Sequence, residues 1–217
     1  LIIFPIILLL ISQPDIGQTL LIILTWFSLI FVSGINLFFF FSFFSIIILI
    51  LSYLIFFIPK FEYIQRRLLT FIDPSSGNNY QSEKASEAIS NGGFFGKGIG
   101  EGQLNSRIPE AHTDYIISVI AEEFGIIIVI VIMLIFLIFA YKVLQKIYFE
   151  KDNKIKLILV GSISLILIKT FIHIGVNIII LPTTGMTLPF LSYGGSSILS
   201  TAVLSGIILN LTKRKLS

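Results

Sequence analysis

Long apolar runs constrain this chain more than any other feature of its sequence. Much of the 217-residue chain falls into largely apolar segments that are separated by polar or proline-containing breaks. A helix needs about 20 such residues to cross the hydrocarbon core of a bilayer. Only 12% of the residues are charged, about half the share that is usual in soluble domains. The sequence therefore predicts an all-α, polytopic helical membrane protein.

We expect about five full spans and one truncated span. The full spans are residues 16–33, 37–58, 115–141, 157–181 and 196–211. Residues 1–11 are apolar but too short to cross a bilayer alone. We therefore expect them to be the end of a helix that is cut within the membrane, which makes the chain a C-terminal fragment. Residues 1–217 are expected to form a single integral membrane domain.

The longest polar segment, residues 59–114, is too long for a simple connector. Apolar residues recur at helical spacing over residues 61–72, with Arg66 and Arg67 on the opposite face. This pattern predicts a short helix that lies in the membrane interface. Turn-forming residues follow at 73–79, and we expect a brief helix over residues 82–90.

The distribution of basic residues predicts the orientation. Residues 142–156, interpreted as a connector, hold five lysines, and Lys213-Arg214-Lys215 lies near the end of the chain. Residues 59–114 hold only six Lys or Arg in a much longer stretch. Dense basic residues mark the cytoplasmic side. The loop 59–114, the break Gln13-Pro14-Asp15 and the loop 182–195 are then all extracytoplasmic, which indicates an outward-facing site.

Asp114 is the first candidate for chemistry. It lies where the long loop meets the next helix, so it could serve only as an N-cap. His112 and Glu110 precede it, and helical spacing places Ser118 and Glu122 below it on one face. A charge in the apolar layer costs about 3 kcal/mol, so Glu122 should face the protein interior or water. We interpret Asp114 as a catalytic base, with capping as the alternative.

A later span carries a matching polar stripe. Lys169, His173 and Asn177 are spaced by four residues and therefore share one helix face. The two helices could line one polar cavity, in which Glu122 pairs with Lys169 or His173. The alternative is a structural ion pair that joins two helices. The histidines lack the spacing of metal ligands, so no metal site is predicted.

The glycine-rich stretch at residues 92–102 does not match a phosphate-binding loop. Lys97 is followed by Gly98 rather than by Ser or Thr, and no strand precedes the stretch. A flexible loop is the simpler interpretation. Bare backbone N–H groups beside Lys97 could still hold a lipid-linked phosphate.

The segment 182–195 is polar and contains two prolines. Irregular backbone cannot be exposed to lipid, so we expect a re-entrant segment that is buried in protein. Residues 194–197 are small and suit close helix packing. Ser192 and Tyr193 are candidate substrate contacts in this segment.

Four sequence blocks together resemble the SEDS family, the FtsW/RodA/SpoVE proteins of bacterial cell growth and division. In the family's order they are Gln13-Pro14-Asp15-Ile16-Gly17, Gly92 through Gly100, Pro109 through Glu123, and Leu181 through Ser197. The third and fourth blocks are highly specific. Residues 70–73 and 185–190 look closer to the division-specific FtsW branch than to RodA.

The resemblance implies a fold of ten spans, of which this chain would contain the end of the fifth through the tenth. It implies a peptidoglycan glycosyltransferase that polymerises lipid II into glycan strands. The enzyme would lie in the bacterial plasma (inner) membrane at the division septum, with its active side extracytoplasmic. The family's essential Asp falls on Asp114. Without the other spans, the chain alone is expected to be inactive.

The implied partners are lipid II, the nascent glycan strand, a class B penicillin-binding protein, other division proteins and membrane lipids. A net charge of +3 is too small to indicate nucleic acid. Asp114 would act as general base on a sugar 4-hydroxyl in an inverting transfer. Cations should lie near the departing pyrophosphate, and no cofactor is certain beyond a candidate divalent cation, Mg or Mn. The expected substrate-binding residues are Lys97, Arg107, Glu110, His112, Glu122, Lys169, His173, Asn177, Ser192 and Tyr193.

Two other functions stay open at this point. A flippase or transporter of lipid-linked sugars would also use polar stripes and broken helices. A scaffold that recruits division proteins would tolerate the replacement of Asp114. Polymer formation from lipid II distinguishes the enzyme from both alternatives.

Overall fold

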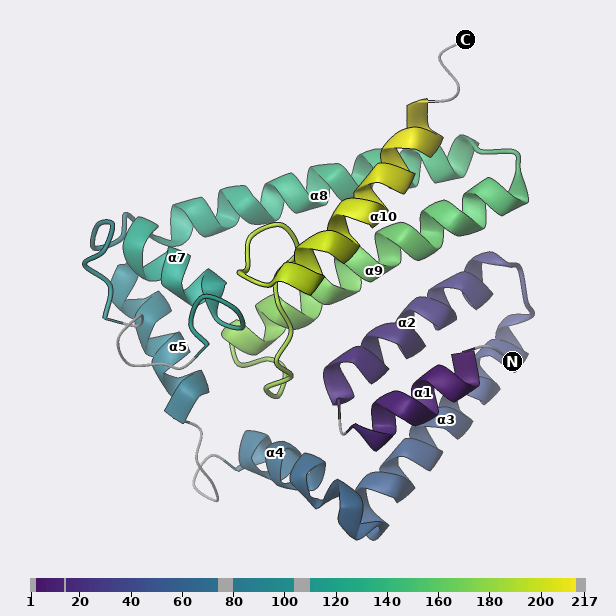
Figure 1. The fold of residues 1–217 in the computed structure, drawn as a ribbon, viewed down its shortest axis with the longest axis horizontal. Coiled ribbons are helices and arrows are strands. Elements are labelled where there is room, and N and C mark those ends of the chain that lie inside the picture. Colours follow the sequence, from purple (N-terminus) through teal and green to yellow (C-terminus); the bar gives the residue numbers. More distant parts are fainter. Residues whose placement is uncertain (1–2, 14, 74–79, 104–109, 214–217) are drawn as a thin grey trace. The chain divides into compact units, whose positions relative to one another are not determined.

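The computed structural model describes residues 3–13, 15–73, 80–103 and 110–213. Every regular element in these ranges is a helix, and the chain divides into two compact units, residues 1–78 and 79–217 (Figure 1). Within the described part of the chain, four helices are long and apolar enough to cross a membrane: α3 (Leu37–Phe57), α8 (Ile126–Phe149), α9 (Asn153–Asn177) and α10 (Gly195–Lys213). The predicted class of a polytopic helical membrane protein is confirmed. The single domain over residues 1–217 stays a prediction.

The first unit contains α1 (Ile3–Ser12), α2 (Ile16–Val32), α3, a short 3-10 turn (Pro59–Phe61) and α4 (Glu62–Ile72). The carboxylate of Asp15 caps α2 by accepting a hydrogen bond from the N–H of Gln18 at 2.9 Å. With 17 residues, α2 lies at the lower limit of length for a span. Phe27 on α2 packs edge-on against Phe40 and Phe44 of α3, with ring centroids 5.5 and 4.8 Å apart.

The short helix predicted over residues 61–72 is observed as α4. Phe61 and Ile64 are buried, while Arg66 pairs with Glu62 at 2.7 Å on the exposed side. The location of α4 in the membrane interface stays a prediction.

The second unit contains α5 (Tyr80–Gly92), α7 (Ile116–Phe124), α8, α9 and α10. The brief helix predicted at 82–90 is observed as α5, which packs against α7. α9 runs beside α8 and also contacts α10 (Figure 1). One core cluster, Ile117, Ala121, Val129 and Leu188, joins α7, α8 and the segment between α9 and α10.

The span predicted at residues 115–141 is wrong as a single helix. Gly125, with φ at +84°, ends α7 and precedes α8. α8 then runs past the predicted end to Phe149 and includes Lys142 and Lys146. Lysine is a good helix former, so the helix continues beyond its most apolar part. The connector predicted at 142–156 is therefore reduced to residues 150–152.

α9 ends earlier than its hydropathy predicts. The apolar run continues to residue 181, but the helix stops at Asn177. Ile179 has φ at +57°, and the N–H groups of Ile180 and Leu181 both donate to the carbonyl of Gly175, at 2.8 and 2.9 Å. The chain thus folds back on the last turn of α9 and continues as the irregular segment that leads to α10.

The glycine-rich loop is attached to the junction of α7 and α8. The N–H groups of Lys97 and Gly98 donate to the carbonyls of Glu122 and Glu123 at 2.9 and 3.0 Å. The loop is therefore bonded along the end of α7 rather than being an unattached connector. These two N–H groups already have partners, and the binding of a lipid-linked phosphate beside Lys97 stays a prediction.

Three glycines make the close backbone approach at this junction possible. A Cβ added to Gly92 would lie 1.9 Å from the carbonyl oxygen of Ala121, and one on Gly96 would lie 2.1 Å from that of Glu123. A Cβ on Gly125 would lie 2.2 Å from the carbonyl oxygen of Phe94. Because each clash is with backbone, no side-chain rotation relieves it.

Gly92→Ala should lower the thermal unfolding midpoint of the detergent-solubilised protein, because the added methyl would push α5 away from α7. Overpacking of this kind costs about 1–3 kcal/mol. Gly206→Ala is the matched control, since a Cβ at Gly206 on α10 meets no atom within 4 Å and alanine favours a helix. Equal midpoints for the two variants would contradict the close approach.

Candidate functional site

A tight turn at residues 110–114 leads into α7. The N–H groups of Thr113 and Asp114 donate to the carbonyl of Glu110 at 3.1 and 3.0 Å. Glu110 has φ at +64°, and its carboxylate accepts a hydrogen bond from the Thr113 hydroxyl at 2.8 Å. The N-cap residue of α7 is Tyr115. The N-cap position considered for Asp114 is therefore wrong by one residue.

Three consecutive carbonyl groups of this turn accept hydrogen bonds from α9 or from the segment that follows it. The pairs are His112 with the N–H of Tyr193 at 3.1 Å, Thr113 with the hydroxyl of Ser192 at 2.6 Å, and Asp114 with Nδ2 of Asn177 at 3.0 Å. The backbone that carries Asp114 is thus fixed at three successive residues by groups far away in the sequence.

Asn177 connects three parts of this site. Its side chain is fully buried, and its Nδ2 donates to the carbonyls of Asp114 and His173 at 3.0 and 2.9 Å. Its Oδ1 accepts from the N–H and the hydroxyl of Ser118 at 3.2 and 2.8 Å. An amide side chain has two N–H donors and two acceptor positions, and all four are used. Asn177 therefore fixes the turn, α7 and α9 to one another.

The carboxylate of Asp114 lies beside the backbone of the segment 182–195. A Cβ added to Gly185 would lie 3.6 Å from Oδ2 of Asp114, and Gly185 has φ at +68°. Asp114 is partly buried, whereas Gly185 is exposed. The carboxylate thus lies at the edge of the site, next to a residue that has no side chain to cover it.

The polar stripe on α9 continues from Asn177 into the same segment. Nδ1 of the fully buried His173 lies 2.7 Å from the carbonyl oxygen of Met186. Lys169 donates to the Ser197 hydroxyl at 2.7 Å, and Ser197 also accepts from Thr187 at 2.9 Å. The stripe therefore holds the irregular segment and the start of α10 against α9.

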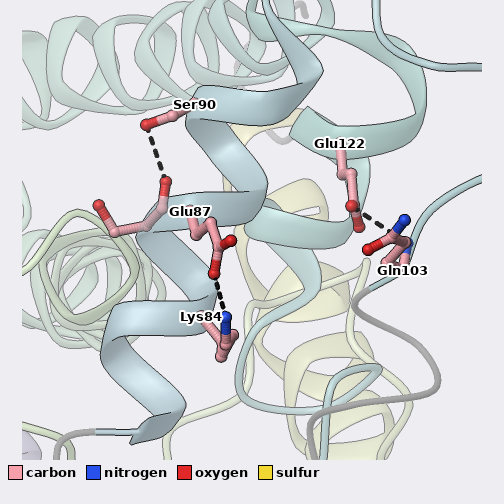
Figure 2. A network of polar contacts seen from close by, with 6 residues as sticks. Lys84, Glu87, Ser90, Gln103 and Glu122 are labelled. Atoms are coloured by element: carbon pink, nitrogen blue, oxygen red, sulfur yellow. Dashed lines mark hydrogen bonds and ion pairs between the residues drawn. The ribbon is translucent and has the colours of Figure 1, made fainter.

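The pairing predicted between Glu122 and Lys169 or His173 is wrong. Glu122 is 2% exposed, and its Oε1 accepts from the N–H of Gln103 at 3.0 Å. Figure 2 shows Glu122 directed to Gln103, with the ion pair of Lys84 and Glu87 on the neighbouring α5. Because α7 is a separate short helix, its acidic side chain faces the glycine-rich loop and not α9. The polar cavity predicted between the two helices stays a prediction.

Most of the other predicted site residues lie around the turn. Asn177 and Ser192 are buried there, and His112 and Tyr193 are exposed beside it. Lys97 is exposed on the glycine-rich loop, and Arg107 lies outside the described residues. Gln13-Pro14-Asp15 belongs to the first unit, so its convergence with the other two loops stays a prediction.

Sequence reasoning missed the anchoring role of the turn's backbone. The carbonyl groups of residues 112 to 114 accept hydrogen bonds whatever side chains these residues carry, so no residue type reveals the contacts. The sequence predicts the polar side chains that donate to them, those of Asn177 and Ser192, as substrate contacts and not as supports of the turn.

The residues that the structure describes contain no group of three or more His, Cys, Asp or Glu that could hold a metal ion. A dependence on Mg or Mn stays a prediction, because Mg²⁺ is often held by only one or two carboxylates together with water and substrate phosphates.

Comparisons with known sequences identify similar proteins. The sequence model of the FTSW_RODA_SPOVE family, described as "Cell cycle protein", matches residues 1–216. A probable peptidoglycan glycosyltransferase FtsW of Caulobacter vibrioides is 34% identical over 207 residues, which are 95% of this chain and 52% of that protein. A protein of the same description from Buchnera aphidicola is 37% identical over 210 residues, which are 94% of this chain and 59% of the relative. The chain thus spans about half the length of these relatives.

The fold is also similar to a solved structure. The similar chain belongs to a peptidoglycan synthase complex described as showing the structural coordination of polymerization and crosslinking. The TM-score is 0.76 at 24% sequence identity, and the match covers 98% of this chain and 60% of the other. This similarity supports the helical fold across both units, each taken by itself.

Asn177→Ala should destabilise the protein, because it leaves the Asp114 carbonyl and the Ser118 hydroxyl without their buried partner. A buried group left unsatisfied costs about 1–3 kcal/mol. Asn210→Ala on α10, where the side chain is exposed, is the matched control. Thermal unfolding in detergent should show a lower midpoint for the first variant only. Equal midpoints would contradict the role of this amide.

Proposed function

The chain belongs to the FtsW/RodA/SpoVE family of cell cycle proteins, and on this premise we propose that it acts in a peptidoglycan glycosyltransferase of cell division. The names of its relatives support this activity, because they are described as probable peptidoglycan glycosyltransferases FtsW. Family membership and four span-length apolar helices make it a multi-pass membrane protein. A location in the bacterial plasma membrane at the septum, with the site on the extracytoplasmic side, is part of the proposal.

The observation that carries the proposal is the fixed position of Asp114. Hydrogen bonds from Tyr193, Ser192 and Asn177 hold the three carbonyl groups of residues 112 to 114. None of these three bonds involves the Asp114 carboxylate. A general base contributes most when its geometry is set before the substrate arrives. Strong fixation of the backbone around a partly buried carboxylate is the arrangement that this role requires.

We assign Asp114 the role of general base in an inverting transfer. Its carboxylate would take the proton from the 4-hydroxyl of the acceptor sugar, whose oxygen would form a bond to the anomeric carbon of the donor. The bond from that carbon to the pyrophosphate would break on the opposite face, and the lipid pyrophosphate would leave with the bonding electron pair. One base and a stabilised leaving group suffice for such a displacement.

Exposure separates the other predicted site residues into two groups. Asn177 and Ser192 are buried, with their polar atoms bonded inside the protein, so we assign them the positioning of Asp114 rather than contact with substrate. The side chains of Tyr193, His112 and Glu110 are exposed beside Asp114, where they could contact the sugars. Lys97 is an exposed cation that could neutralise the pyrophosphate, as could Arg107.

The proposed substrates are lipid II and the nascent glycan strand. The structural neighbour comes from a complex that coordinates polymerization and crosslinking. This supports a crosslinking partner for the present protein, and we propose a class B penicillin-binding protein. Contacts with other division proteins, and a dependence on Mg or Mn, stay predictions.

In the full-length protein, Asp114→Asn should reduce polymerisation of lipid II by at least about 100-fold, the smaller end of what a general base contributes. Asparagine preserves the shape of the side chain but cannot accept the proton. The polymer would be resolved by gel electrophoresis after incubation of purified protein with lipid II. Glu101→Gln, which removes an exposed carboxylate from the glycine-rich loop, should leave the rate unchanged.

The same assay, together with the division of cells that carry Asp114→Asn, distinguishes the alternative functions. A flippase would move lipid II between the leaflets of a vesicle and form no polymer. A scaffold would support division equally well with Asp114→Asn. Unchanged polymer formation by Asp114→Asn, with the thermal unfolding midpoint preserved, would exclude the role of general base.

A further inference from the structure

The glycine-rich loop presents three large apolar side chains that pack against little of the protein. Phe94, Phe95 and Ile99 are 71%, 84% and 78% exposed. Transfer of such a side chain from water to an apolar environment is worth about 1.5–3 kcal/mol. Three of them within six residues form an apolar surface that a fully hydrated loop would not favour.

The position of this apolar surface is set by α8. The N–H of Ile126, the first residue of α8, donates to the carbonyl of Gly93 at 3.0 Å. The carbonyl oxygen of Phe94 lies against Gly125. α8 is apolar from its first turn, where Ile127 and Ile128 are 41% and 40% exposed. The loop therefore leaves the protein at the level where the membrane-spanning surface of α8 begins.

The loop is held at this level through its backbone. Besides the bond to Ile126, the N–H groups of Lys97 and Gly98 donate to the end of α7. The loop also carries two exposed charged residues, Lys97 and Glu101. The loop thus exposes both apolar and charged side chains. Segments that lie between the acyl chains and the headgroups of a bilayer have the same mixture.

We propose that the glycine-rich loop is a membrane-surface anchor, in which Phe94, Phe95 and Ile99 insert into the interfacial layer of the bilayer next to α8. Aromatic and aliphatic side chains gain free energy there by leaving water. The amine of Lys97 would lie among the lipid phosphates, which attract basic residues. Because the same loop is bonded to the end of α7, the anchor would set the height of α7 and of the Asp114 turn above the membrane.

The chain contains no cysteine, so single nitroxide labels can be placed at chosen positions. Phe95→Cys tests the anchor, Glu101→Cys is the matched control on the same loop, and Leu134→Cys, half-exposed on α8, gives a reference inside the span. The labelled proteins would be reconstituted into vesicles of phosphatidylethanolamine and phosphatidylglycerol. Electron paramagnetic resonance would compare the collision of each label with oxygen, which enters lipid, and with a water-soluble nickel chelate.

The proposal predicts that the oxygen-to-nickel ratio at position 95 is several-fold higher than at position 101 and lower than at position 134. Equal ratios at positions 95 and 101, with position 134 within lipid, would overturn it. A label at position 95 that is shielded from both reagents would also overturn it, because a protein partner would then cover the loop. These outcomes do not depend on the role of Asp114, which only the polymerisation assay tests.

Discussion

The polar site of the second unit depends on one buried amide. Asn177 ends α9 and uses every hydrogen-bonding position of its side chain to hold α7 and the turn that carries Asp114. A buried polar group that lacks a partner is costly, so the amide favours the one arrangement in which Ser118 and the Asp114 carbonyl both reach it. Ser192 and Tyr193 then hold the same turn from the following segment. The site is therefore assembled from contacts distant in the sequence, and it depends on α9 ending at residue 177.

A second constraint lies at the junction of α7 and α8. The glycine-rich loop approaches this junction so closely that Gly92, Gly96 and Gly125 leave no room for a Cβ. The chain breaks at Gly125, so α7, which carries Glu122, is a separate helix from the apolar α8. The carboxylate of Glu122 then accepts a hydrogen bond from the N–H of Gln103. The proposed insertion of Phe94 and Phe95 into the bilayer would give the same loop a second attachment, to lipid.

The sequence predicts the helical membrane fold because an apolar run of about 20 residues is what a helix needs to cross the hydrocarbon core of a bilayer. It predicts the helix ends less well. Residues 178–181 are apolar yet follow α9, because the chain folds back on Gly175, and Lys142 and Lys146 are charged yet helical. Asp114 is found through the motif that surrounds it. The hydrogen bonds that hold its turn are not predictable from the sequence, because backbone carbonyl groups accept hydrogen bonds whichever side chain a residue bears. The hydrogen bond of Glu122 to Gln103 depends on the helix break at Gly125, which hydropathy does not predict.

The three anchored carbonyls have a consequence for redesign of the site. They belong to the main chain, so an exchange of the exposed side chain at position 112 should leave these three hydrogen bonds in place. His112 is exposed beside the carboxylate, and a panel of neutral, basic and acidic residues at this position would alter the local electrostatic potential with the geometry kept constant. The electrostatic surroundings of the carboxyl group and its placement thus become separate, independently adjustable variables.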